Sequence, residues 1–292
     1  MKMFINISED LIMIEFGGDW TKNKIEILVK YAKAYLKIMK DRPYWKLLYF
    51  DGFAGTGFIV KNEKTNIDIT IGAARRIVEI EKPRGFDHFY FVEKNKSNAR
   101  LLAKSTKEVF PNKDIQIKED DCNTKLAELS KFLLSSKGKN FRVLAYIDPY
   151  GMQLEWKSII SLSKAKIDIW ILVPTGLGVN RLLKKNGEID ETWLTRLEMF
   201  LGLDAKSIKS FFYKTETDLT LFGEEEHTKK EKDAINLSGK LYQERLKSVF
   251  AFVSQPYILK STQGNIMYHM FMASNNKTAV KIANDIIKNY NG

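Results

Sequence analysis

Residues 47–59 read LLYFDGFAGTGFI, a short apolar run that ends in an acid and opens into three glycines. Four consecutive apolar residues predict a strand buried on both faces of a parallel sheet. Gly52, Gly55 and Gly57 then allow positive φ angles and a close approach of the backbone to a ligand. This order of strand, acid and glycine loop is typical of the nucleotide-binding turn of a doubly wound fold. A tight turn without a ligand is the alternative. The missing Gly-Lys-Ser/Thr argues against a triphosphate cofactor.

The charge of the chain favours a polyanionic partner. The sequence has 47 Lys and Arg against 36 Asp and Glu, which gives a net charge of +11. Such an excess of basic residues is typical of proteins that bind nucleic acid, so we expect DNA or RNA as the partner. Because acids lie between the lysines along the whole chain, a lysine-rich solvated surface is the alternative.

The composition also excludes several other classes of protein. A chain of 292 residues with 44% hydrophobic residues can bury the core of a large domain. No stretch approaches the roughly 20 apolar residues of a membrane span, and acids interrupt the N-terminal apolar run, so we expect a cytoplasmic protein with no membrane partner. The lone Cys122 excludes an internal disulfide framework. His88, His227 and His269 lie at no usual ligand spacing, so no metal site is expected.

Two further strands are each followed by an acid. Residues 88–92, HFYFV, predict a second strand that ends at Glu93. An acid in this place can accept both hydroxyls of a ribose, which favours an adenosine-type cofactor at the glycine loop. The alternative is that Glu93 merely ends the strand and binds no ligand. Residues 115–118, IQIK, predict a third strand before a cluster of acids. There Asp121 is placed to accept the exocyclic amine of an adenine, with Asp120 as the alternative.

A fourth strand, residues 142–147, leads into Asp148, Pro149, Tyr150 and Gly151. Ligands of open α/β sheets bind outside the carboxyl ends of the strands, so Asp148 and Tyr150 are expected at the same crevice as the glycine loop. A carboxylate can accept the hydrogens of an amine, and an aromatic ring can stack on a planar substrate. A proline turn with a packed tyrosine is the alternative.

The remaining segments complete the predicted organisation. A helix at residues 20–40 precedes the first strand, residues 61–68 are expected to be irregular, and Asn123 is expected to cap the next helix. Residues 1–178 then form the core. Residues 179–247 are charged and mostly helical, which predicts an insertion that could be winged-helix-like, with an exposed loop at 223–233. Residues 248–292 complete the core with an antiparallel hairpin, from strands at 249–259 and 265–273, and a final helix.

This order of elements resembles the Rossmann-like, seven-stranded class I S-adenosylmethionine-dependent methyltransferase fold. DGFAGTG, residues 51–57, is similar to the D-x-F-x-G-x-G motif of base-modifying methyltransferases. VEKN, residues 92–95, resembles their second-strand acid. DPYG, residues 148–151, resembles their catalytic D-P-P-Y, although one proline is missing and a glycine follows the tyrosine.

A broader resemblance covers most of the chain. The stretches WTKNKIEILVKYAKAYLKIM, YFDGFAGTG, FVEKN, YIDPYG, ILVPTGLGVNR and MYHMFMASNNKTAVKI together look like the three-Cys-motif partner family. The resemblance implies a methyltransferase-like core and S-adenosyl-L-methionine as the cofactor. It also implies a partner protein that bears a three-cysteine motif, so the single cysteine of this chain fits the family.

The resemblance implies a role for each candidate residue. The methionine end of the cofactor would lie on the backbone of Phe53, Ala54, Gly55 and Gly57, its amino group near Asp51, its ribose at Glu93 and its adenine at Asp121. Asp148 with Pro149 would orient a target amine, and Tyr150 would stack on the base. The first hypothesis is therefore methyl transfer to a nitrogen of a nucleic-acid base. There are two alternatives. One is a methyltransferase that acts on a protein or peptide together with an encoded partner, and the other is a non-catalytic binding module.

Overall fold

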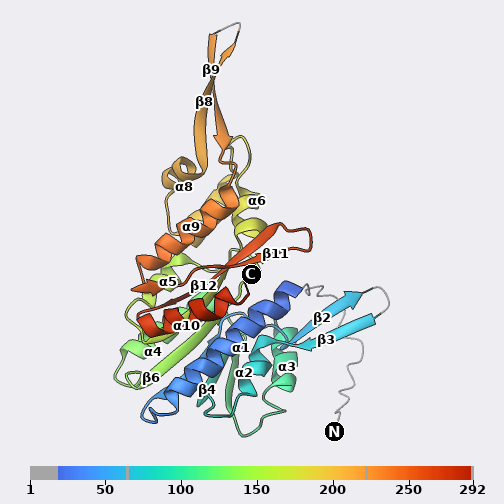
Figure 1. The fold of residues 1–292 in the computed structure, drawn as a ribbon, viewed down its shortest axis with the longest axis vertical. Coiled ribbons are helices and arrows are strands. Elements are labelled where there is room, and N and C mark those ends of the chain that lie inside the picture. The colour runs from blue at the N-terminus through green and yellow to red at the C-terminus, as the bar shows by residue number, and fades with distance from the viewer. Residues whose placement is uncertain (1–18, 64–65, 221–222, 291–292) are drawn as a thin grey trace.

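The computed structural model describes residues 19–63, 66–220 and 223–290, and their centre is one mixed sheet of eight strands (Figure 1). In spatial order the strands are β10 Phe252–Val253, β12 Ile266–Ser274, β7 Ile167–Val173, β6 Phe141–Ile147, β1 Lys46–Asp51, β4 His88–Val92 and β5 Asp114–Lys118, with β11 Tyr257–Lys260 also paired to β12. The five strands from β7 to β5 are parallel, and β12 runs antiparallel to β7. The predicted Rossmann-like fold is confirmed.

The first predicted strand of the C-terminal hairpin differs from the structure in one respect. The expected strand at 249–259 is divided into β10 and β11, which both pair with β12. Pro256 has no backbone N–H to donate, which interrupts the ladder between the two pieces. Ser254 turns inward there, and its hydroxyl accepts the backbone N–H of Met272 at 2.9 Å. The sheet therefore has one strand more than the seven that the sequence predicts.

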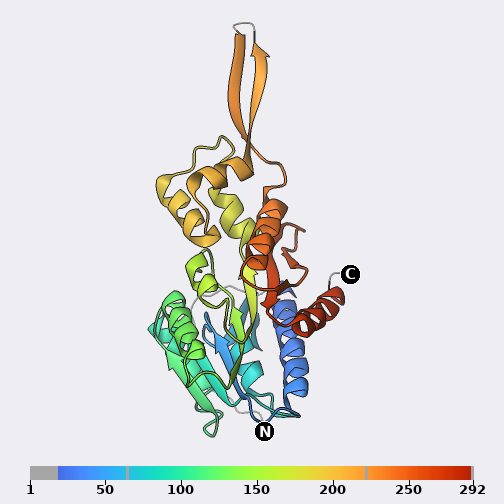
Figure 2. The same ribbon diagram turned by 90° about the vertical axis from the view of Figure 1, so that its left-hand side faces the viewer.

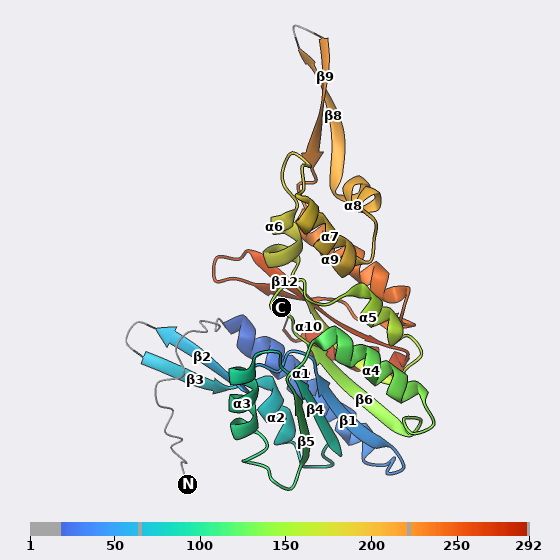
Figure 3. The same ribbon diagram turned by 180° about the vertical axis from the view of Figure 1, so that it is seen from behind.

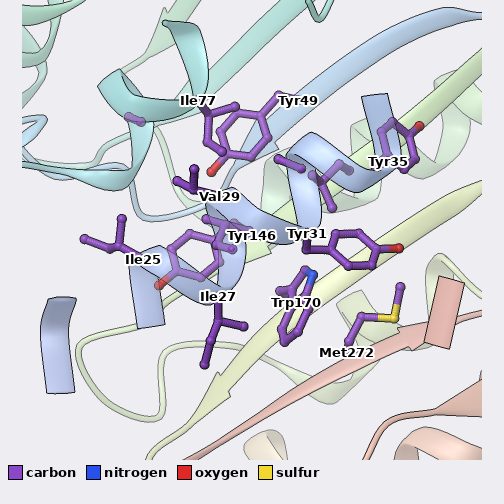
Figure 4. Packing of buried hydrophobic residues seen from close by; sticks show 14 of the residues in the cluster. Ile25, Ile27, Val29, Tyr31, Tyr35, Tyr49, Ile77, Tyr146, Trp170 and Met272 are labelled. Carbon is purple, nitrogen blue, oxygen red and sulfur yellow. The ribbon is translucent and has the colours of Figure 1, made fainter. Parts of the chain in front are cut away.

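Helices cover both faces of the sheet (Figures 1 and 3). One face carries α1 Asp19–Met39, α2 Ala73–Val78, α3 Lys96–Ser105 and α10 Lys277–Lys288, and the other carries α4 Cys122–Leu134, α5 Trp156–Ser161, α7 Glu191–Leu201 and α9 Ala234–Lys247. The apolar stripe of α1 packs on the sheet, where Tyr31 meets Trp170 edge-on (Figure 4). Burial of each large side chain of this kind contributes about 1.5–3 kcal/mol, so α1 is firmly fixed to the core.

Residues 175–247 form a unit that packs on this second face and extends beyond the sheet. It contains the π-helix η1 Thr175–Val179, the helices α6 Asn180–Leu182, α7, α8 Ala205–Phe212 and α9, and the antiparallel strands β8 Tyr213–Thr220 and β9 Gly223–Lys230. The β8–β9 hairpin extends away from the helices as a narrow arm (Figure 2). The exposed loop predicted at 223–233 is wrong, because most of it is strand β9. The described side chains of the arm's strands beyond its base are exposed, so no apolar alternation marks them in the sequence. The winged-helix-like interpretation stays a prediction.

A second hairpin lies where the sequence predicted an irregular segment. Of the segment expected to be irregular at 61–68, residues 61–63 lie in β2 Phe58–Glu63 and residues 66–68 in β3 Asn66–Ile71, and residues 64–65 fall outside the described residues; the two strands pair in a separate two-stranded sheet. The sequence does alternate, with isoleucine at positions 67, 69 and 71. Asp68 and Thr70 lie between these isoleucines, which gives the period-two pattern of a strand, but the polar run at 61–66 just before it obscured that signal.

Candidate functional site

The glycine loop after β1 is tied to the strands on both sides of it. The backbone N–H of Gly52 donates to the Tyr146 carbonyl of β6 at 2.9 Å, and that of Ala54 donates to the Val92 carbonyl of β4 at 3.0 Å. The N–H of Gly55 donates to Oε2 of Glu93 at 3.0 Å. The loop therefore lies across the carboxyl edge of three adjacent parallel strands, the position at which ligands of open α/β sheets bind.

Glycine is required at two positions of this loop for different reasons. Gly57 has φ +78°, and a Cβ there would collide with the Ser105 hydroxyl of α3. Gly55 has φ +62° but open space around the position of a Cβ. Positive φ is costly for residues with a side chain. Gly55 thus leaves room in front of the loop, which is the kind of cradle that the backbone of a cofactor-binding turn provides.

Asp51 ends β1 beneath the loop and is fully buried. Its Oδ1 accepts the backbone N–H of Phe53 at 3.2 Å, and its Oδ2 accepts the hydroxyl of Tyr49 at 3.4 Å. Burial raises the pKa of the Asp51 carboxyl to about 7, because the charged form is poorly solvated there; the Phe53 N–H opposes this and the Asp148 charge adds to it. A cationic group bound beside Asp51 would favour its ionised form.

Glu93 faces the loop from the end of β4. Its Oε2 accepts from Gly55 as described above, and its Oε1 accepts the backbone N–H of Asn95 at 2.7 Å. Asn95 in turn caps α3 by accepting the N–H of Asn98. The carboxylate is therefore held by backbone donors on both sides. It lies where a ribose beside the glycine loop would offer its hydroxyls.

The two aspartates after β5, Asp120 and Asp121, make different contacts. Asp120 forms an ion pair with Lys125 at 2.9 Å, whereas Asp121 caps α4 by accepting the N–H of Thr124 at 3.1 Å. The predicted cap at Asn123 is wrong, because α4 already begins at Cys122. Asn123 instead joins α4 to the loop after Asp148, where its Oδ1 accepts the N–H of Glu155 at 2.8 Å.

Asp148 is held by two residues that the sequence analysis missed. Its Oδ2 accepts from Lys24 Nζ at 2.6 Å and from the Tyr146 hydroxyl at 3.0 Å. Lys24 comes from α1 and is 9% exposed. A signal for it does exist, since helical geometry puts Lys24 about 200° around α1 from Lys22, on the apolar side of the helix. A lysine on a buried face usually has an anionic partner.

Tyr150 lies at the surface beside this ion pair. Its side chain is 71% exposed, while Pro149 is buried. Tyr268 of β12 also belongs to the site, because burial together with Asp148 and Tyr150 raises the pKa of its hydroxyl to about 12. The structure thus brings the predicted Asp148, Pro149 and Tyr150 to the edge that carries the glycine loop, and adds an aromatic residue that the sequence analysis did not single out.

Two kinds of site are absent from the described residues. None of their helices combines the length and apolar character that a membrane crossing requires. Across the same residues, no three His, Cys, Asp or Glu side chains gather into a group that could hold a metal ion.

Comparison with known proteins gives similarity in fold only. No protein-family model and no curated protein sequence matches the chain. Among solved structures, protein LPL1258 from Legionella pneumophila is similar at 16% identity and a TM-score of 0.40, over 87% of this chain and 97% of that one. Magnesium protoporphyrin IX methyltransferase from Synechocystis, solved with S-adenosylhomocysteine, is similar at 13% identity and a TM-score of 0.40, over 90% of this chain and 88% of that one. Trm1 from Pyrococcus horikoshii, solved with S-adenosylmethionine, is similar at 12% identity and a TM-score of 0.37, over 90% of this chain and 65% of that one.

These identities and TM-scores are low, so the class of the fold rests on the strand order. Counted along the core, the parallel strands β1, β4, β5, β6 and β7 are arranged 3-2-1-4-5, as in doubly wound nucleotide-binding folds. Antiparallel β12 follows β7, and β10 and β11 pair with β12 beyond it. The chain therefore has a Rossmann-like fold. The resemblance to the three-Cys-motif partner family stays a prediction.

Proposed function

We propose that this protein is an S-adenosylmethionine-dependent methyltransferase that acts on a nitrogen of a nucleic-acid base. The observation that carries the proposal is the glycine loop held between Asp51 and Glu93, with Asp148 on the neighbouring strand. An adenosine-type cofactor needs a close backbone approach, a ribose acceptor and an acid for its amino group, and this edge offers all three. Asp121, at the end of the third strand, is the proposed acceptor for the adenine amine.

The chemistry asked of the protein is mainly positioning. When bound, the cofactor supplies a methyl group on a positively charged sulfur, which is already an activated donor. The target nitrogen would bond to this methyl group in place of the sulfur, which would keep the bonding electron pair, and the nitrogen would then release its proton to water. Because the donor is activated, the protein has to align the nitrogen with the methyl group and exclude other geometries.

Asp148 is the proposed acceptor for the hydrogens of the target amine. Lys24 and Tyr146 both hold its Oδ2, whereas no described residue donates a hydrogen bond to Oδ1. Oδ1 is therefore the oxygen left for the substrate. Tyr150, exposed beside it, would stack on the base. If the target base lies in a duplex it must be flipped out, at a cost of roughly a few kcal/mol.

The test is transfer of a labelled methyl group to mixed DNA and RNA by the wild type and by Asp148→Asn. Asp148→Asn keeps an oxygen acceptor but removes the charge, so we expect it to bind cofactor and to lose most of its transfer rate. Glu155→Gln, a nearby acid outside the proposed site, serves as the matched control. Equal transfer by the wild type and Asp148→Asn would overturn the role of Asp148.

The same assay decides between the alternatives. Label that appears on a co-purified polypeptide, and on no nucleic acid, would indicate a protein substrate such as the proposed three-Cys-motif partner. No transfer and no cofactor binding by a folded wild type would indicate a binding module. The D-P-Y-G sequence motivates this second alternative, because it lacks the second proline of D-P-P-Y.

A further inference from the structure

The helices α1 and α10 lie side by side on one face of the sheet (Figures 1 and 2). They are joined at one point by Lys30, whose Nζ lies 4.6 Å from the ring centre of Tyr290 just after α10. Their outer surfaces carry seven exposed lysines, four from α1 and three from α10. We call these the α1/α10 lysine face: Lys22, Lys30, Lys33, Lys37, Lys277, Lys281 and Lys288.

The spacing of these lysines places those of each helix along one side of that helix. With 3.6 residues per turn, the four lysines of α1 fall within about 80° of one another and span roughly 22 Å along the helix. The three lysines of α10 fall within about 40° and span roughly 16 Å. Each of the two neighbouring helices thus presents its own row of positive charge.

The charge of the face is not neutralised within the described residues. None of the seven lysines forms an ion pair there, whereas Lys113, Lys125 and Lys214 elsewhere on the surface each pair with an acid. The acids with described side chains on the two helices are Glu26 and Asp285. Glu26 pairs with Arg76 of α2, and Lys30 and Lys33 also lie close enough to help lower the pKa of its carboxyl; Asp285 lies between Lys281 and Lys288, so two acids accompany the seven lysines. Seven like charges held this close attract a polyanion.

The residue types on the face favour one class of polyanion. Protein–protein interfaces are depleted in lysine and depend on aromatic and arginine anchors. In the described part of α1 and α10, the large apolar side chain that stands out is Ile38, at 37% exposure. The ring of Tyr290 lies beneath Lys30, which leaves no platform for stacking single-stranded bases. Compact ammonium groups in rows suit the phosphates of a regular backbone.

We propose that the α1/α10 lysine face binds the phosphodiester backbone of a double-stranded nucleic acid, without reading its sequence. The inference rests on the proposed function and extends it, because α1 starts at the candidate site, where Lys24 contacts Asp148, and runs away from it. The substrate is then a polynucleotide that spans both the face and the site. A free nucleoside or nucleotide would not use the face.

The test is fluorescence anisotropy with a labelled duplex of roughly 20 base pairs, as DNA and as RNA, from about 50 to 200 mM salt. The face variant is Lys33→Gln, Lys37→Gln and Lys281→Gln together. The matched control is Lys131→Gln, Lys137→Gln and Lys139→Gln, an equal change of charge on and just after α4, on the opposite layer. We expect the face variant to bind about ten- to a hundred-fold more weakly, with a salt slope smaller by roughly 3 for DNA, because each lost phosphate contact changes it by about 0.9.

Three outcomes would overturn the inference: face-variant binding equal to the wild type, an equal loss in both variants, or binding of poly-glutamate as tight as that of the duplex. The DNA and RNA arms identify which nucleic acid the face prefers. Titration of S-adenosylmethionine into each variant keeps the two proposals separate. Cofactor binding without duplex binding at the face contradicts this inference alone, whereas no cofactor binding by the wild type contradicts the proposed function.

Discussion

The two halves of the candidate site are built in different ways. Around the glycine loop, backbone groups from β1, β4 and β6 hold each other and the carboxylate of Glu93. Around Asp148, the contacts come from side chains, those of Tyr146 two positions earlier and of Lys24 on the distant helix α1, and Tyr150 beside it is exposed. A half built from backbone is ready before a ligand arrives, whereas a half built from side chains can rearrange around a substrate. We therefore expect changes to the side chains around Asp148 to reduce methyl transfer while leaving cofactor binding intact.

The largest effect is expected at Gly57, which belongs to the backbone-built half. Gly57→Ala places a side chain at positive φ and against Ser105, so we expect a loss of about 2–4 kcal/mol in the free energy of unfolding together with the loss of cofactor binding. Urea unfolding measures it. Gly151→Ala is the matched control, since nothing lies within 4 Å of a Cβ there. A Gly57→Ala protein as stable as the control would show that the loop is not rigid.

The next effect is expected at Lys24, in the half built from side chains. Lys24→Met removes the charged hydrogen bond to Oδ2 of Asp148, an interaction worth about 1.5–3 kcal/mol, so we expect the rate of transfer to fall about ten- to a hundred-fold. Cofactor affinity should stay at the wild-type value. Lys24→Arg should restore part of the rate, because it keeps the charge. If Lys24→Met weakened cofactor binding instead, the division between the two halves would be wrong.

A smaller effect is expected from pH. Burial raises the pKa of Asp51 from 3.8 to about 7 in the free protein, so the carboxyl is largely neutral at pH 6 and ionised at pH 8. The amino group of the cofactor is a cation and favours the ionised form. Cofactor affinity should therefore rise about tenfold between pH 6 and pH 8 and then level off. Calorimetric titration at several pH values measures it.

Asp51→Asn is the control for this pH dependence, and it should bind weakly with no rise. Stability should show the opposite trend in the free protein. A carboxyl with a raised folded pKa contributes stability at low pH and loses it as pH rises from about 4 through about 7. Asp51→Asn should consequently gain stability relative to the wild type at pH 8 and not at pH 4. A wild-type affinity that does not change with pH would place the cofactor's amino group away from Asp51.

Local patterns explain what the sequence could predict. The core strand before Asp51 is a continuous apolar run, and the glycines follow it directly, so both could be recognised within 13 residues. The acids at the ends of β4, β5 and β6 were placed on one edge because parallel strands require it. These features depend on neighbours in the sequence and on a general rule of topology.

The missed features depend on distant contacts or on weak patterns. Lys24 and Asp148 are separated by 124 positions, and no local signal in either stretch names the other. In the β8–β9 arm, the side chains that the structure describes beyond its base are exposed, and the sequence there lacks the alternation by which strands are recognised. The cap of α4 was misplaced by two positions, because Asp121 and Asn123 are both good capping residues.

The most direct measurement is calorimetric titration of S-adenosylmethionine into the wild type, Glu93→Ala and Glu119→Ala. Glu119 is an exposed acid just after β5 and outside the proposed site, so it controls for the lost charge. We predict saturable binding to the wild type and to Glu119→Ala, and a loss of binding in Glu93→Ala. Equal binding by all three proteins would contradict the cofactor site at the glycine loop, and no binding by the folded wild type would contradict the methyltransferase itself.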